Sequence, residues 1–218
     1  MKKPSMISFL TTLLLAAMIC THGQEPVKDS AGNSLETGQQ YFIQPVSNIG
    51  GGLVPAAVSI IRICPLGIVQ ALDPSRPGQQ VSFESLSPNT DSIVTTSTDV
   101  TIEFKSNFWP ACKKLSKFWE VDESSSSEPA ILIGGEPERP NSQFKIEKAG
   151  EGEGAGANTY KFTSLTGTVG VIPGFWGIQL VVTNDTAKTL LVEFRKDNKA
   201  TTSTSMVEKL GLRMFPSY

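Results

Sequence analysis

Short segments with the composition of β-strands recur along most of the chain and constrain the fold more than any other feature. They are rich in Val, Ile, Phe, Tyr, Trp and Thr, several alternate apolar and polar residues, and turn-forming residues separate them. No apolar pattern of period 3.6 persists for three helical turns. About twelve strands are predicted, at 41–43, 58–63, 68–72, 81–83, 92–96, 100–104, 118–121, 131–133, 144–146, 160–162, 177–183 and 189–194. This pattern predicts an all-β domain, either a closed barrel or a sandwich.

The first 23 residues have the layout of a secretory signal peptide. Two lysines precede an apolar run over 6–20, and the small residues Thr21 and Gly23 stand before a predicted cleavage site ahead of Gln24. The run is shorter than the ~20 apolar residues of a membrane-spanning helix, and no later stretch is apolar enough to span a bilayer. We therefore expect a secreted, extracellular or apoplastic protein, or one held in the vacuole or in a body derived from the endoplasmic reticulum.

Cleavage at this site would remove the only histidine, His22, and we expect three parts along the chain. The parts are the signal peptide at 1–23, one domain at 24–200, and a tail at 201–218 whose trimming the sequence leaves open. Without histidine, a Ser-His-Asp triad, a Cys-His dyad and a His-ligated metal site are excluded. Loss of two lysines leaves 17 basic against 21 acidic residues, a charge of −4, which argues against nucleic acid as a partner. We expect a protein that is not an enzyme.

Two cysteines would remain after cleavage, because Cys20 leaves with the signal peptide. In an oxidising compartment Cys64 and Cys112 are expected to pair, the alternative being two free thiols. The bridge would close a loop of 48 residues, for which the chain-entropy model gives about 4 kcal/mol. Asn184 begins the one glycosylation sequon, Asn184-Asp185-Thr186, and the sequence does not determine its use.

The chain resembles the plant Kunitz-type inhibitors over essentially all of its mature length. Residues 27–35 (VKDSAGNSL), followed by Tyr41-Phe42-Ile43, are similar to the opening signature of that family. The agreement continues at 64–66, 119–121, 133–135, 144–146 and 160–162. The resemblance implies a β-trefoil, with twelve strands in three pseudo-repeats. The family's usual second disulfide is not matched, since no cysteine lies between Phe162 and Gly177.

Longer matches are similar to one subfamily, the water-soluble chlorophyll proteins of the cabbage family. They are 42–45 (FIQP), 50–57 (GGGLVPAA), 64–68 (CPLGI), 109–112 (WPAC), 115–122 (LSKFWEVD) and 207–218. This resemblance implies a soluble carrier that binds one chlorophyll, a or b, per subunit and assembles as a homotetramer. The corresponding hypothesis is a pigment scavenger that shelters chlorophyll released when cells are damaged.

The resemblance also implies a pigment site around residues 53–55. The magnesium ligand of the subfamily is a backbone carbonyl that falls on Pro55. Magnesium prefers oxygen, and proline has no amide hydrogen of its own to satisfy. Gly50-Gly51-Gly52 would let the backbone approach a large ring closely. A plain flexible loop containing a proline is the alternative.

Flat apolar walls for the ring are expected from two tryptophans and their neighbours. Trp109 and Trp176 match pocket positions of the subfamily, and Leu53, Val54 and Leu66 would add apolar surface. The alternative is that both tryptophans are ordinary core residues. Trp119 belongs to the general Kunitz strand and is interpreted as structural.

Three departures from the subfamily bear on pigment binding. Arg62 stands where an apolar or aromatic residue is typical, and Arg76 stands where a neutral glutamine is typical. Because a buried, unpaired arginine is costly, Arg76 either points to solvent, pairs with Asp73 or weakens binding. The loop Gly174-Phe175-Trp176-Gly177 is shorter than usual, which affects the placement of Trp176.

The alternative function is that of a Kunitz protease inhibitor, which presents a rigid convex loop. The candidate inhibitory residues are Ser87, Pro88, Asn89, Thr90 and Asp91, with Thr90 nearest the main pocket of the protease. A trypsin inhibitor needs Arg or Lys there, and none stands between Val81 and Glu103. The family's loop-supporting asparagine falls on Thr37. A papain-like cysteine protease is therefore the preferred target, and a storage or stress-response protein without a ligand fits the composition equally well.

Overall fold

The computed structural model describes residues 24–47, 49–59, 63–86, 92–106, 112–124, 127–150 and 156–197. The chain in these ranges forms twelve strands and two short 3₁₀ helices. The strands are β1 (Tyr41–Pro45), β2 (Leu53–Ala57), β3 (Leu66–Gln70), β4 (Gln80–Ser85), β5 (Asp99–Phe104), β6 (Phe118–Val121), β7 (Ile131–Gly135), β8 (Phe144–Lys148), β9 (Tyr160–Ser164), β10 (Gly167–Gly174), β11 (Gly177–Thr183) and β12 (Val192–Lys196). The 3₁₀ helices are η2 (Pro140–Ser142) and η3 (Thr186–Lys188).

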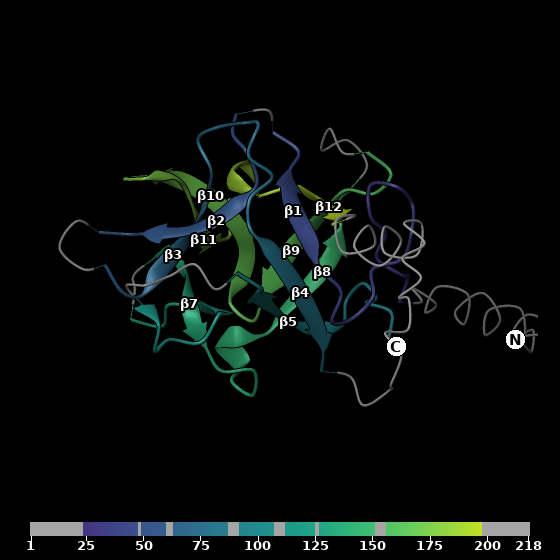
Figure 1. Cartoon of the computed structure of the whole chain (residues 1–218), viewed down its shortest axis with the longest axis horizontal. Coiled ribbons are helices and arrows are strands. Elements are labelled where there is room, and N and C mark those ends of the chain that lie inside the picture. Colours follow the sequence, from purple (N-terminus) through teal and green to yellow (C-terminus); the bar gives the residue numbers. More distant parts are fainter. Residues whose placement is uncertain are drawn as a thin grey trace, which may run out of the picture.

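Six of the strands close into a ring of antiparallel pairs. β1 pairs with β4, β4 with β5, β5 with β8, β8 with β9, β9 with β12, and β12 returns to β1. Closure gives every strand in the ring a paired neighbour on both sides and leaves one enclosed interior. These strands lie together on the right of Figure 1.

The remaining six strands form three hairpins, β2–β3, β6–β7 and β10–β11. Strand β3 pairs with β11 and β7 and so joins the hairpins to one another. In each third of the chain, the first and fourth strands enter the ring and the middle two form a hairpin. This arrangement is the β-trefoil that the resemblance implied.

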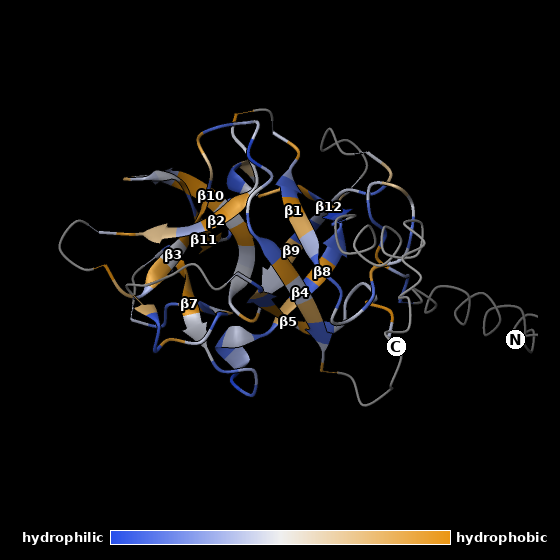
Figure 2. Cartoon of the chain, in the orientation of Figure 1, coloured by the Kyte–Doolittle hydropathy of each residue, from blue (hydrophilic) through white to orange (hydrophobic). Residues whose placement is uncertain are grey.

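The enclosed interior holds a cluster of aromatic rings at its centre. Trp119 is fully buried, with its ring centroid 5.6 Å from Phe104, 6.2 Å from Phe144 and 6.0 Å from Phe162. Alternate residues of the strands face this core, which gives the mixed orange and blue ribbons of Figure 2. Trp119 is thus structural, as predicted.

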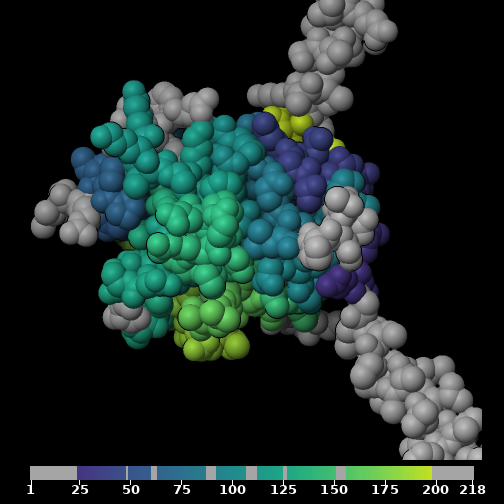
Figure 3. Space-filling view, turned by 90° about the horizontal axis from the view of Figure 1, so that it is seen from below, coloured from purple at the N-terminus to yellow at the C-terminus, as the bar shows by residue number. Residues whose placement is uncertain are grey.

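Residues 27–35 are held to the ring and to the segment around Val94 by backbone hydrogen bonds, and the Ser30 amide donates to the Phe194 carbonyl of β12 at 2.7 Å. The Val27 and Val94 amides donate to the carbonyls of Val94 and Leu35 respectively, at 2.9 and 2.8 Å. Asp29 is buried and accepts from the backbone amides of Ala31 and Asn33, which folds the segment into a tight turn. In Figure 3 this purple segment lies along one side of the molecule.

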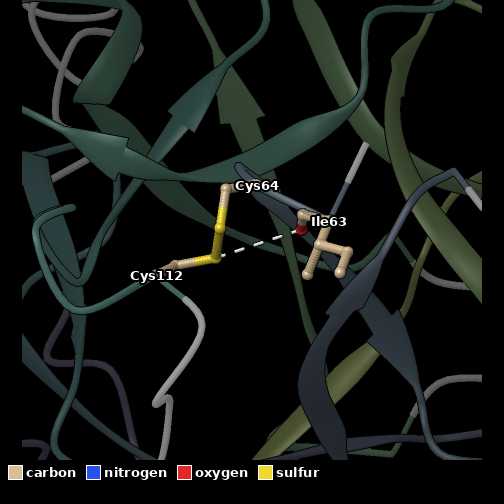
Figure 4. Close-up of a disulfide and its surroundings, with 3 residues drawn as sticks. All are labelled: Ile63, Cys64 and Cys112. Carbon is tan, nitrogen blue, oxygen red and sulfur yellow. Dashed lines mark hydrogen bonds between the residues drawn. A yellow bond between two sulfur atoms is a disulfide. The ribbon is translucent and has the colours of Figure 1, made fainter. Parts of the chain in front are cut away.

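The predicted disulfide is present and joins the segment before β3 to the segment before β6. Cys64 and Cys112 have Cα atoms 5.9 Å apart, and the Cys64–Pro65 peptide bond is cis. The dashed line in Figure 4 joins the Cys112 Sγ to the Ile63 carbonyl oxygen at 4.0 Å. A disulfide has no S–H, so we treat this as a contact and not as a hydrogen bond.

The count of twelve strands is correct, but two of the predicted strands are not among those observed. The strand expected at 58–63 is wrong, because Val58, Ser59 and Ile63 are not in a strand. Residues 60–62 lie outside the described residues. Strand β2 ends at Ala57, immediately before the expected segment. The segment 92–96 forms only the isolated bridges Glu36–Ile93 and Pro26–Thr95. In their place the chain forms β2 and β10.

No helix within the described ranges is long and apolar enough to cross a membrane.

Candidate functional site

The outer face of the β2–β3 hairpin, together with the tip of β10–β11, borders an open cavity of about 600 Å³. Apolar side chains supply most of its lining, and two charged residues lie at the rim. The lining residues are Val54, Ala56, Ala57, Ile63, Val69, Ala71, Leu72, Asp73, Arg76 and Trp176. A concave, mainly apolar surface of this size suits a large, flat organic ligand.

Strand alternation sorts the residues of this hairpin between the cavity and the core. Val54 and Val69 face each other across the β2–β3 ladder, and both line the cavity. Residues of the opposite alternation point the other way: Leu53, next to Val54, and Leu66, three positions before Val69, are 1% and 8% exposed and belong to the core. Of the expected apolar wall, the structure therefore brings Val54 to the cavity and packs Leu53 and Leu66 behind it.

The β10–β11 turn carries two exposed aromatic rings. Phe175 and Trp176 connect the paired residues Gly174 and Gly177, and Gly177 has a φ of +142° that side-chain-bearing residues rarely adopt. The two rings meet edge to face with centroids 5.0 Å apart, and they are 60% and 55% exposed. The short turn thus places Trp176 at the cavity that Val54 lines.

The carbonyl group of Pro55 points away from the ladder. In an antiparallel pair, alternate residues turn their backbone groups toward and away from the partner strand. Leu53 pairs with Gln70, yet its carbonyl accepts from the Gln79 amide at 2.8 Å, on the side away from β3. Pro55, two residues later, has the same orientation, and its missing N–H costs no ladder bond there.

The three glycines before β2 lie against backbone atoms of residues 71–77 of the same chain. A Cβ on Gly50 would lie 2.5 Å from the Ala71 oxygen, one on Gly51 2.3 Å from the Asp73 oxygen, and one on Gly52 2.0 Å from the Pro77 oxygen. The Gly52 amide also donates to the Arg76 carbonyl at 2.8 Å. The run is therefore a close contact between two backbone segments, and the alternative of a plain flexible loop does not hold for it.

Arg76 both points to solvent and pairs with Asp73, two of the three alternatives considered for it. Its Nε lies 3.9 Å from the Asp73 Oδ2, and its side chain is exposed. The hydroxyl and the backbone amide of Ser75 donate to Asp73, and these bonds, more than Arg76, lower the pKa of the Asp73 carboxyl. The rim of the cavity thus holds a charge pair in water, not a buried cation.

Several predicted site residues lie outside the described residues. They are Arg62, the inhibitory-loop candidates Ser87, Pro88, Asn89, Thr90 and Asp91, and Trp109. Next to that loop, the backbone amide of Thr37 donates to the Ser92 carbonyl at 2.7 Å, and its hydroxyl lies 3.5 Å from the same oxygen. Thr37 therefore contacts the chain at the exit of the loop.

Sequence reasoning did not identify most of the cavity wall. Ala56, Val69, Ala71 and Leu72 line it, together with Ile63, and none of these was predicted. Alternation along 53–57 and 66–71 would have grouped the first three with Val54, had β2 been recognised as a strand.

The glycosylation candidate Asn184 is exposed, directly after β11 and at the end away from Trp176. The next residue, Asp185, caps η3 by accepting from the Ala187 amide at 3.0 Å. Lys188 in turn forms a 2.6 Å bond with Glu128. Within the described part of the chain, no three His, Cys, Asp or Glu side chains gather where they could hold a metal ion.

Comparisons with known proteins agree with this architecture. The model of a family described as trypsin and protease inhibitor, the legume Kunitz family, matches residues 27–196. Kunitz trypsin inhibitor 2 of Arabidopsis thaliana is 62% identical over 212 residues, which are 94% of this chain and 97% of that protein.

Solved structures extend the similarity. A water-soluble chlorophyll protein from Brassica oleracea var. Botrytis, described with chlorophyll b, is 54% identical with a TM-score of 0.75, over 80% of this chain and 100% of that one. Soybean trypsin inhibitor is 26% identical with a TM-score of 0.66, over 79% and 100%. The chain belongs to the Kunitz family of plant trypsin and protease inhibitors.

Proposed function

We propose that this protein is a chlorophyll-binding protein and not an enzyme. The observation that carries the proposal is the apolar cavity over β2–β3, with exposed Trp176 at its edge. The similarity to water-soluble chlorophyll proteins, at 54% and 52% identity, supports chlorophyll as the ligand. Whether chlorophyll a or b is preferred is a question for the binding experiment below.

The described residues fit such a ligand. Val54 and Trp176 offer apolar and flat aromatic surface, on which a macrocycle can pack. The carbonyl of Pro55 is turned from its ladder and is an oxygen donor of the kind that magnesium prefers. We propose it as the ligand to the pigment magnesium, with Trp109 as a further wall that the adjacent Cys64–Cys112 bridge holds in place.

We further propose that pigment binding is coupled to assembly as a homotetramer. Leu72, Phe175 and Trp176 all expose more than half of their surface beside the cavity. A pigment sandwiched between such surfaces would favour the assembled state by mass action. The expected role is to scavenge chlorophyll from damaged cells, in the secretory pathway or outside the cell, after removal of residues 1–23.

Reconstitution tests the proposal. The chain from Gln24 would be mixed with chlorophyll a or b, freed of unbound pigment, and followed by absorbance during size exclusion. Pigment that co-elutes with a tetramer is expected, and a colourless monomer would contradict the proposal.

Two variants locate the pigment. Trp176→Ala and Trp109→Ala are each expected to lower the amount of chlorophyll that the protein retains several-fold. Leu165→Ala is the matched control, because Leu165 is 82% exposed but lies at the β9–β10 turn, away from the cavity residues. Equal retention in Trp176→Ala and Leu165→Ala would show that the pigment does not bind at this cavity.

Protease inhibition is a second proposed function, favoured by the family match and by the name of the Arabidopsis relative. The contact of Thr37 with Ser92 supports it, because it braces the exit of the candidate loop 87–91. The absence of Arg and Lys from that loop makes a papain-like cysteine protease the expected target, rather than trypsin. Titration against papain and trypsin tests this: stoichiometric inhibition of papain alone is expected, and inhibition of neither would contradict it.

A further inference from the structure

A second cavity, of about 350 Å³, lies on the opposite face of β3 from the first. Val69 and Ala71 line the first cavity, whereas Gln70 between them lines the second, because successive residues of a strand face opposite sides. Its walls come from the β1–β2 connection, from β10 and β11, and from η3 and the residues after it. The other lining residues are Val46, Ser47, Ile49, Val171, Ile178, Ala187, Lys188, Thr189, Leu190 and Leu191.

Gln70 is the unusual member of this wall. Its side chain is 1% exposed, and its Nε2 is buried without a hydrogen-bond partner in the described structure. A buried amide donor without an acceptor costs about 1–3 kcal/mol, and such groups in native proteins commonly mark a bound water, ion or ligand. A Cβ on Gly50 would lie 3.2 Å from the Gln70 Cδ, so the backbone of the β1–β2 connection confines this amide.

The charges at the cavity favour a neutral ligand. Lys188 is the charged residue of the lining, but its ammonium is engaged by Glu128 Oε1 at 2.6 Å and lies 4.0 Å from Asp185 Oδ2. An anion in the cavity would thus lack a free counter-charge to offset the free-energy cost of its desolvation. The apolar walls and the exposed Ile49 at the surface favour a ligand with a hydrocarbon body.

We propose that this second cavity binds a small, neutral, mainly hydrocarbon molecule whose carbonyl or hydroxyl oxygen accepts a hydrogen bond from Gln70 Nε2. The volume corresponds to roughly ten water molecules, which limits the ligand to a single ring or a short chain. The site is separate from the proposed pigment site, because β3 lies between them. The proposal does not depend on chlorophyll binding.

The experiment compares two ligands of nearly equal shape on the ¹⁵N-labelled mature chain. Acetophenone carries a carbonyl oxygen, and ethylbenzene has the same ring and a two-carbon substituent without oxygen. In amide-detected NMR titrations, acetophenone is expected to shift the side-chain NH₂ signals of Gln70 and the backbone signals of 187–191. Ethylbenzene is expected to bind on the order of tenfold more weakly, since it leaves the amide unpaired.

Three variants identify the site. Gln70→Leu removes the donor, assigns the Gln70 signals by their disappearance, and should abolish the preference for acetophenone. Gln179→Leu is the matched control: Gln179 lies on β11 opposite Val69, is absent from the cavity lining, and its loss should leave the preference unchanged. Trp176→Ala, at the first cavity, should also leave acetophenone binding unchanged.

Three outcomes would overturn the proposal: no saturable shift with acetophenone, equal affinity for the two ligands in the parent protein, or loss of acetophenone binding in Trp176→Ala. The second criterion holds even if Gln70→Leu does not fold. Chlorophyll retention is measured separately, so failure at the second cavity is distinguishable from failure of the proposed function.

Discussion

Two tryptophans of this chain occupy opposite environments. Trp119 is fully buried in the ring interior, against Phe104, Phe144 and Phe162, whereas Trp176 is 55% exposed at a hairpin turn, against Phe175. The ring closes on itself and has an inside, which large rings fill. The hairpin has an outer face on which, among the described residues, Phe175 and Trp176 remain more than half exposed. The same residue type therefore stabilises the fold in one region and offers a binding surface in the other.

Truncating the two tryptophans should separate these roles most strongly. Trp119→Ala is expected to lower the free energy of unfolding by about 3–5 kcal/mol, because it leaves a cavity among three aromatic rings. Trp176→Ala is expected to change it by about 0.5 kcal/mol or less, since most of that ring is already in water. Urea unfolding measures both. Similar losses in the two variants would remove the distinction between the regions.

The disulfide joins the segment before β3 to the segment before β6, and its loss should have the next largest effect. Cys64 and Cys112 are 48 residues apart, so Cys64→Ala combined with Cys112→Ala should lower the free energy of unfolding by about 4 kcal/mol in the chain-entropy model. Unfolding of the double variant, compared with the parent in oxidising buffer, measures it. A loss below about 1 kcal/mol would mean that the bridge contributes little beyond the sheet itself.

The segment before β2, beside the exposed cavity, should nevertheless be rigid, because its glycines contact backbone atoms. Gly52→Ala is expected to cost roughly 1–3 kcal/mol, because the new Cβ would lie 2.0 Å from the Pro77 oxygen. The matched control is Gly156→Ala, whose Cβ would meet the side chains of Glu193 and Thr159 at an ordinary 3.6 Å. This control should be neutral or slightly stabilising. Equal stability of the two variants in thermal unfolding would contradict the close packing of this segment.

The smallest expected effects are two pKa shifts of opposite sign, to be followed by carboxyl ¹³C NMR. In the β6–β7 hairpin, burial, with a smaller contribution from the charge of Asp122, raises the pKa of Glu120. At the cavity rim, bonds from Ser75 lower the pKa of Asp73. Ser75→Ala should return the Asp73 pKa toward its ordinary value and leave Glu120 unchanged, and any other response would place the cause of the shift elsewhere.

The sign of each stability effect follows from the shift. The contribution of Glu120 is fully present below its unfolded-state pKa and is lost as pH rises through its raised folded-state pKa. The contribution of Asp73 is present above its unfolded-state pKa and is lost as pH falls through its lowered folded-state pKa. Glu120→Gln should therefore reduce the loss of stability on raising the pH across the acidic range.

The ring was more predictable than the hairpins for a physical reason. Strands such as β5 and β12 are rich in β-branched and aromatic residues, and their patterns were recognised, with boundaries shifted by a few residues. Strand β10 contains Gly170 and Pro173, which disfavour strands in isolation, yet it pairs with β11 over seven residues. Strand β2 likewise holds Pro55 and two alanines and is extended by pairing with β3.

The candidate site divides in the same way. Resemblance identified Val54 and Trp176, which line the cavity, and Pro55, which is not among the lining residues. It also grouped Leu53 and Leu66 with them, and strand alternation turns those two into the core. Gly50, Gly51 and Gly52 were expected to let the backbone approach a ligand closely. In the structure they lie against the backbone of residues 71–77. Local sequence does not reveal these contacts, because they join segments that only the fold brings together.

The sequence by itself determined the all-β class, the positions of ten of the twelve strands to within a few residues and the pairing of Cys64 with Cys112. Composition, alternation and cysteine count are local or countable properties, and they act in any arrangement of the strands. Only the tertiary structure decided which segments became β2 and β10 and which face of β3 borders each cavity. It also decided that Trp176 is exposed whereas Trp119 is buried. Those outcomes depend on burial and long-range pairing, which are defined only once the ring has closed.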